Sequence, residues 1–146
     1  MDSIESAAAN FKEGFNCAQS VFSAFAAQLG LDRETALKLA TPFGGGIAGT
    51  GQTCGVVSGA LMAIGLKLGT TSADKEARGK TYAAARKFME LFKDRHGSIL
   101  CREILGCDIG TPEGMKNAQD KKLFATLCSK VVKDAAEILS QVLEQA

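Results

Sequence analysis

The sequence has no tryptophan, one tyrosine, one histidine and two prolines among its 146 residues, and it has almost no strand-forming pattern. No apolar–polar alternation continues for more than four residues. Alanine, the best helix former, is frequent, and apolar residues recur with the helical period of 3.6. We therefore expect an all-α fold, a single-domain bundle of five to six helices over residues 1–146. We expect a buried, glycine-rich central helix at Cys54–Leu68.

An excess of one charge and a long apolar run are also missing. Lys and Arg number 17 and Asp and Glu 16, so the basic surface that a nucleic-acid partner requires is absent. The longest uncharged stretch outside a glycine-rich loop has thirteen residues, Cys54–Leu66, whereas a membrane span needs about twenty. Met1–Glu5 is acidic where a secretory signal would be basic. We expect a cytoplasmic protein that binds no nucleic acid and has no membrane span.

Local cysteine motifs are absent although the chain has five cysteines. The sequence contains no CxxC, no CxxCH and no ferredoxin spacing, so no thioredoxin-type pair or covalent haem site is encoded locally. Stable structural disulfides are uncommon in the cytoplasm. Either the thiols are buried as small hydrophobic groups, or the fold gathers them into one site. The five are Cys17, Cys54, Cys101, Cys107 and Cys128.

The cysteines differ in their expected surroundings. Cys54 and Cys101 fall in the first turn of predicted helices, where the helix dipole and free N–H groups lower a thiol pKa. Cys17 and Cys128 lie on apolar stripes, as packing residues would. The one histidine, His96, follows a run of charges at a predicted helix C-terminus, so we expect a solvated imidazole and not a metal ligand.

A glycine-rich loop spans Phe43–Gln52, with five glycines in eight residues. Gly46–Thr53 fits the phosphate-binding frame GxxxxGK[ST], except that Gln52 replaces the lysine that holds the phosphates. The segment before the loop also looks helical, so we do not expect nucleotide binding. Two interpretations remain. The loop could be a tight turn close to another backbone, or its N–H groups could point toward Cys54 and stabilise a thiolate or a cluster sulfide.

Capping residues and periodicity predict where the helices begin and end. Small residues at Gly55, Ser58 and Gly59 would let a second helix approach closely. The apolar stripe of the last predicted helix could face its own core or a second copy in a homodimer. The remaining predicted helices are Ser3–Leu29 with a break at Gly14, Arg33–Ala40, a helix from Ser72 or Asp74 to Arg95, a short one with Cys101, and Lys121–Glu144.

Taken together, several short motifs are similar to those of a known family. They are Asn16–Gln19, Phe43–Gly46, Cys54–Gly59, Cys101–Gly106 and Cys128. In this combination the chain resembles the C_GCAxxG_C_C family, also known as the CGAxxG-motif, four-cysteine family. The family name records a suspected redox activity. The resemblance extends from about Phe11 to Ala136, and Val56 stands where the family motif has alanine.

The resemblance implies a four-cysteine site. The family's four cysteines match Cys17, Cys54, Cys101 and Cys128, which leaves Cys107 as the extra one. A related domain in split-Soret cytochromes resembles an iron–sulfur site with cysteine ligands. We therefore expect an electron-transfer protein with an iron–sulfur cluster. Zinc is the alternative, although this chain lacks the short CxxC-type knuckles of structural zinc sites.

Two further interpretations stay open. The chain could be a thiol–disulfide oxidoreductase or redox sensor that cycles Cys54 with Cys101, without a metal. It could also be a structural or partner-binding helical module with buried cysteines and no cofactor. The sequence names neither a redox partner nor a substrate, and it leaves open whether the protein is an enzyme.

Overall fold

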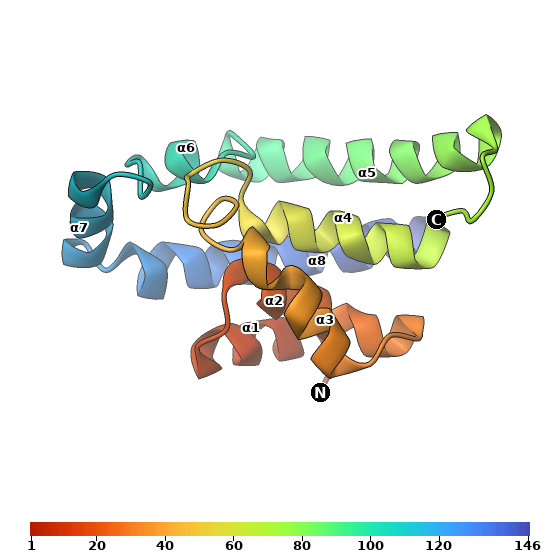
Figure 1. The fold of residues 1–146 in the computed structure, drawn as a ribbon, viewed down its shortest axis with the longest axis horizontal. Helices are drawn as coiled ribbons and strands as arrows, with labels where there is room; N and C mark the ends of the chain where they lie inside the picture. The colour runs from red at the N-terminus through yellow and green to blue at the C-terminus, as the bar shows by residue number, and fades with distance from the viewer.

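The computed structural model describes residues 1–146 and is entirely helical (Figure 1). Its only strand-like feature is one isolated bridge between Thr53 and Leu100. The all-α prediction is confirmed, but eight α-helices are present where five to six were expected. The helices are α1 (Ser3–Glu13), α2 (Cys17–Ala26), α3 (Arg33–Ala40), α4 (Gly55–Leu68), α5 (Lys75–His96), α6 (Cys101–Leu105), α7 (Pro112–Asp120) and α8 (Ser129–Gln145).

The additional helices arise because local signals divide the chain into short elements. The predicted break at Gly14 is present. The backbone φ of Gly14 is 119°, a value that residues other than glycine rarely adopt. Asn16 then starts α2 with a capping box: its side chain accepts from the Gln19 N–H, and the Gln19 side chain accepts from the Asn16 N–H. Cys17 is therefore the first residue of α2.

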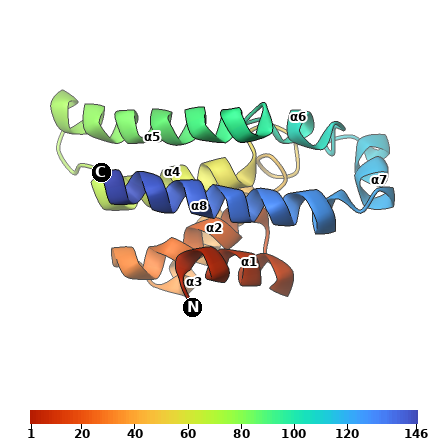
Figure 2. The same cartoon turned by 180° about the vertical axis from the view of Figure 1, so that it is seen from behind.

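Helices α2, α4 and α8 form the middle of the molecule, with α5 along one edge and α1 and α3 along the opposite edge (Figures 1 and 2). The contact between α2 and α4 is the most extensive in the molecule. It depends on Gly59, because a Cβ at this position would come within 2.8 Å of the Ala18 carbonyl oxygen. Leu66, near the end of α4, is 37% exposed.

Helix α5 packs differently from the prediction. Helical periodicity predicts Tyr82, Ala85, Met89 and Phe92 on the inward face, but of these only Phe92 is fully buried, and Phe88 is buried beside it. Tyr82 is 55% exposed, because most residues in the first half of α5 lie away from the core. None of the helices combines the length and apolar character that crossing a membrane would require.

Two hydrophobic clusters divide the interior. A large core of 24 buried residues involves α1 to α5 and α8. A small cluster of five lies around α6, α7 and the π-helical turn Phe124–Cys128 that precedes α8. Its members are Cys101, Leu105, Ile109, Ala118 and Cys128.

Candidate functional site

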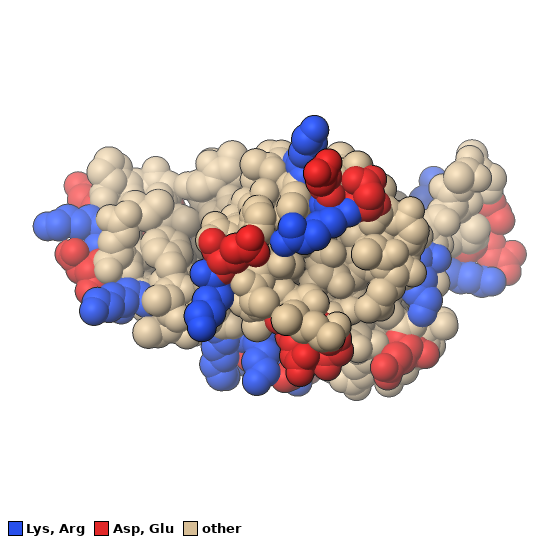
Figure 3. Space-filling view, turned by 90° about the horizontal axis from the view of Figure 1, so that it is seen from below, with Lys and Arg blue, Asp and Glu red and all other residues tan.

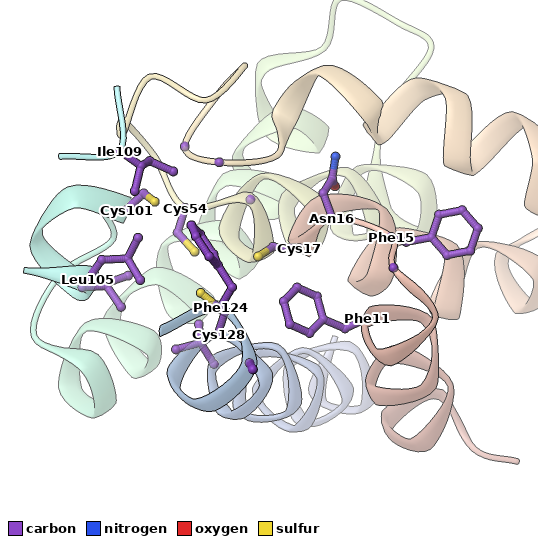
Figure 4. Close-up of a pocket in the computed structure, with 17 residues that line it drawn as sticks. Phe11, Phe15, Asn16, Cys17, Cys54, Cys101, Leu105, Ile109, Phe124 and Cys128 are labelled. Carbon is purple, nitrogen blue, oxygen red and sulfur yellow. The ribbon is translucent and has the colours of Figure 1, made fainter. Parts of the chain in front are cut away.

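A cavity of about 410 Å³ lies between the two clusters, and four of the five cysteines line it (Figure 4). The four thiols come from four separate segments, 37, 47 and 27 residues apart in the sequence. The structure thus brings together Cys17, Cys54, Cys101 and Cys128. The rest of the wall includes three aromatic rings, Phe11, Phe15 and Phe124, and carries no charged side chain.

Cys54 and Cys101 are held side by side by the backbone. The Cys54 N–H donates to the Ile99 carbonyl at 2.7 Å, and the Cys101 N–H donates to the Gln52 carbonyl at 2.6 Å. These reciprocal bonds tie the start of α4 to the start of α6. Cys54 itself occupies the N-cap position of α4, so the helix begins one residue later than the predicted Cys54–Leu68.

Cys128 is placed by an interruption in the last helix. The sequence predicted one continuous helix from Lys121 to Glu144, but Phe124–Cys128 forms a π-helical turn, and regular α-helix begins only at Ser129. Lys122, just before this turn, has a positive φ of 54°. Single π-turns are rare and occur frequently at functional sites. The turn ends at Cys128, whose side chain faces the cavity.

The glycine-rich loop packs tightly against the site. Gly45 and Gly46 line the cavity, and a Cβ on Gly46 would lie 2.7 Å from the Cβ of Cys101. This confirms the interpretation of a turn close to another part of the chain. The alternative, in which the loop directs N–H groups at Cys54, is wrong for residues 48–52. Their amides donate to carbonyls of residues 42–47 within the same segment.

Burial controls the protonation of the cavity thiols. It raises the pKa of Cys54 to about 11, although the N–H groups of Val56 and Val57 act in the opposite direction. Burial, followed by the neighbouring thiols, raises the pKa of Cys101 to about 12. The expectation that helix N-termini would lower both values is wrong, because removal from water costs the charged form more than the helix ends return.

Cys17 and Cys128 form the most closely coupled pair. Each thiol affects the protonation of the other through a side-chain interaction, and all five cysteines are free thiols. This interaction, with burial, raises the pKa of Cys17 well above its ordinary value, and the same interaction lowers the pKa of Cys128. The titrations of the two thiols are therefore coupled to each other.

The arrangement also bears on metals. No three Cys, His, Asp or Glu side chains converge in a way that could hold one metal ion. A zinc ion needs its thiolate ligands about 2.3 Å away around a single point. The donor set is nevertheless four soft thiols on one cavity wall, which is the ligand set of iron–sulfur clusters.

The other sequence candidates lie outside the cavity lining. Cys107 is half-buried, and its thiol donates to the Leu105 carbonyl at 3.8 Å. His96 was expected to be solvated, but only 7% of its side chain is exposed. It lies against Phe92 and 3.2 Å from an Asp134 oxygen, without the alignment of a hydrogen bond. Burial lowers the pKa of His96.

The sequence analysis missed the aromatic part of the wall. Phe11 and Phe15 come from α1 and the turn after it, and Phe124 comes from the π-helical turn. In Figure 4 the rings of Phe11 and Phe124 lie beside the sulfur atoms, whereas the ring of Phe15 points away from them. Helical periodicity identifies Phe11 and Phe124 as apolar positions, but no local signal shows that they border a cavity and not a solid core.

Comparison with known proteins gives a family and nothing closer. The family described as "Putative redox-active protein (C_GCAxxG_C_C)" matches residues 15–142, so the chain belongs to it. No curated protein matches the chain. No solved structure matches it either.

Proposed function

We propose that this chain is an electron-transfer protein whose four cavity thiols bind an iron–sulfur cluster. The observation that carries the proposal is that Cys17, Cys54, Cys101 and Cys128 line one uncharged cavity although they come from four segments. Family membership adds a redox character to this thiol site. When bound, such a cluster supplies one-electron transfer.

The grouping of the thiols favours a two-iron cluster. A [2Fe–2S] cluster takes two protein ligands on each iron, whereas a single zinc ion requires all four thiolates around one point. Cys17 and Cys128, which affect each other's protonation through a side-chain interaction, would form one pair. Cys54 and Cys101, joined by reciprocal backbone hydrogen bonds around them, would form the other.

The remaining residues would control the surroundings of the cluster. The rings of Phe11 and Phe124 would shield a bound cluster from water, and Gly46 allows the loop to close against Cys101. Thiols must lose their protons before they bind metal. Since burial raises the pKa of Cys54 and Cys101, loading would release protons and would be favoured at higher pH.

The coupled protonation of Cys17 and Cys128 favours a second candidate, a thiol–disulfide function without metal. In that case a low-molecular-weight disulfide accepts two electrons from the two thiols. One S–S bond forms between Cys17 and Cys128, the external S–S bond breaks, and two thiols leave. The pair predicted from the sequence was Cys54 with Cys101, but the mutual effect on protonation favours Cys17 with Cys128.

The test compares anaerobically purified parent protein with five single Cys→Ser variants. Absorption spectra, together with iron, sulfide and zinc contents, are measured on each. We expect visible absorption with equal iron and sulfide in the parent and in Cys107→Ser, and loss of both when any of the four cavity cysteines is replaced. Loss in Cys107→Ser alone, or five variants that match the parent, would contradict the assignment.

The same samples separate the alternatives. Colourless protein with one zinc per chain would replace the cluster by a zinc site. Colourless, metal-free protein that loses two titratable thiols on oxidation, with a Cys17–Cys128 cross-linked peptide, would support the second candidate. Colourless protein whose thiols react slowly before and after oxidation would indicate a packing role for the cysteines.

A further inference from the structure

One helix carries an excess of positive charge. The chain as a whole has a formal net charge of only +1. Helix α5 nevertheless contains seven of the 17 Lys and Arg residues and only three of the 16 Asp and Glu residues. The rest of the chain is therefore slightly acidic. Figure 3 views the molecule from the side opposite α5, where basic and acidic side chains are mixed.

The basic residues of α5 include a continuous stripe. Lys75, Tyr82, Arg86 and Lys93 are spaced by seven, four and seven residues, which places them on the same face of a helix. All four are exposed, and Lys75, Arg86 and Lys93 take part in no salt bridge. Of the acidic residues of α5, Glu76 and Asp94 lie about a quarter turn away on the helical period of 3.6, and Glu90 lies closer, between Arg86 and Lys93 at one side of this face. We call these four residues the α5 stripe.

The α5 stripe has the character of an interaction surface. Helix α5 forms one edge of the molecule in both ribbon views, and only Phe88 and Phe92 of its 22 residues are fully buried (Figures 1 and 2). Tyr82 lies in the middle of the stripe with 55% of its surface exposed. Tyrosine and arginine are the residue types that recur at protein–protein hot spots. Three cations without salt bridges, in line with an exposed aromatic ring along one helix face, fit an acidic protein surface.

The stripe also leads to the thiol cavity. Helix α5 ends at His96, and the chain reaches Cys101 on the cavity wall five residues later. A protein that covers the C-terminal half of α5 therefore lies next to the segment that holds one of the four thiols. We propose that the α5 stripe is the docking surface for an acidic electron-carrier protein. The partner's role as a carrier rests on the proposed function, whereas the docking itself depends only on the stripe.

The experiment measures binding of an acidic plant-type ferredoxin by titration calorimetry at roughly 0.01 M and 0.15 M ionic strength. The test variant is R86E/K93E in the stripe. The matched control is K12E/K38E, which makes the same change in net charge at two exposed lysines of α1 and α3, on the opposite edge. We expect the parent to bind, more weakly at higher salt. The stripe variant should lose affinity by about tenfold or more and the control by less than about threefold.

Three results would overturn the proposal. They are no binding of the ferredoxin at the lower salt, equal losses in the two double variants, and tighter binding of a single-stranded oligonucleotide that is lost in R86E/K93E. The titration is repeated with Cys54→Ser, which should lack the cluster. Because the docking depends only on the stripe, this variant should bind the ferredoxin as the parent does. A colourless parent that still binds the ferredoxin through the stripe would contradict the electron-transfer function but keep the docking surface. A coloured parent that does not bind the ferredoxin would contradict the docking surface but keep the electron-transfer function.

Discussion

The two hydrophobic clusters differ in size, in the elements that build them and in what they border. The large core has 24 buried residues on the faces of long helices and includes Cys54. The small cluster has five residues, two of them Cys101 and Cys128. Cys17 packs against both. The cavity thus lies on the boundary, and each proposed ligand pair contains at least one thiol from the small cluster.

The difference separates stability from function within one chain. Helix α6 has only five residues, far fewer than the roughly 12–15 that an isolated helix needs to be even marginally stable. It holds its position through tertiary contacts, including the backbone bonds to the segment before α4. A group bound across the cavity would connect the small cluster to the large core. We therefore expect changes in the large core to unfold the protein, and changes in the small cluster to alter the site first.

Two leucine-to-alanine substitutions, one in each cluster, test this comparison and should have the largest effect. Leu139 is fully buried in the large core, whereas Leu105 belongs to the small cluster and lines the cavity. We expect Leu139→Ala to lower the free energy of unfolding by about 2–5 kcal/mol. Leu105→Ala should cost about 2 kcal/mol or less, because that side chain already borders empty space. Urea unfolding measures both, and equal costs would contradict the division.

Leu105→Ala should instead affect the thiols. Without this side chain, water reaches the cavity more easily. We expect faster labelling of Cys101 by a thiol reagent in folded Leu105→Ala than in the parent, and no change in Leu139→Ala below its unfolding transition. Labelling followed by peptide mass spectrometry measures the rates. Unchanged Cys101 labelling in Leu105→Ala would show that Leu105 does not shield the site.

Two glycines of α4 sharpen the comparison inside the large core. Gly59→Ala should destabilise the protein by about 1–3 kcal/mol, because its new Cβ would meet the Ala18 carbonyl oxygen. Gly65 has open space around it, so Gly65→Ala should stabilise by about 0.5–1 kcal/mol through helix propensity. Thermal or urea unfolding of both variants gives the signs. A stabilising Gly59→Ala would show that α2 and α4 can separate without cost.

Acidification should weaken the junction of α5 and α8. Burial lowers the pKa of His96, so the folded protein binds fewer protons than the unfolded chain as pH falls below about 6.5. Stability is therefore fully present above that pH and is lost as pH falls through the folded-state pKa. The charged groups around His96 are Asp134, Arg95 and Lys130.

The variant His96→Gln removes this titration and keeps a polar side chain beside Asp134. We expect the urea midpoint of the parent to fall more steeply than that of the variant between pH 7 and pH 5. Parallel curves would mean that His96 does not contribute to the pH dependence. This effect should be smaller than those of the core substitutions, because only one partly screened group is involved.

The smallest effect is expected outside both clusters. Tyr82→Ser removes a half-exposed ring from the α5 stripe and should change the free energy of unfolding by less than about 0.5 kcal/mol. Urea unfolding checks this value. A larger loss would show that Tyr82 packs on the fold, and it would weaken the case for a free binding surface.

Most of the local structure was predictable because its causes are local. Asp32 caps the predicted helix Arg33–Ala40, and its side chain accepts from the Thr35 N–H. Gly30 and Gly97 end helices in the left-handed conformation, and Pro112 begins α7 after Thr111. Each signal acts within one helical turn. The cytoplasmic location and the homodimer stay predictions from the sequence.

The sequence by itself determined the helical class, most helix ends and the identity of the four cysteines, because capping, periodicity and motif matches are read along the chain. Only the tertiary structure decided where those cysteines lie and how they behave. The π-helical turn at Cys128, the bonds that place Cys54 beside Cys101 and the burial of His96 depend on segments distant in sequence. Thiol protonation depends on them as well, because desolvation is set by everything packed around a group, and here it outweighs the helix ends that the sequence could show.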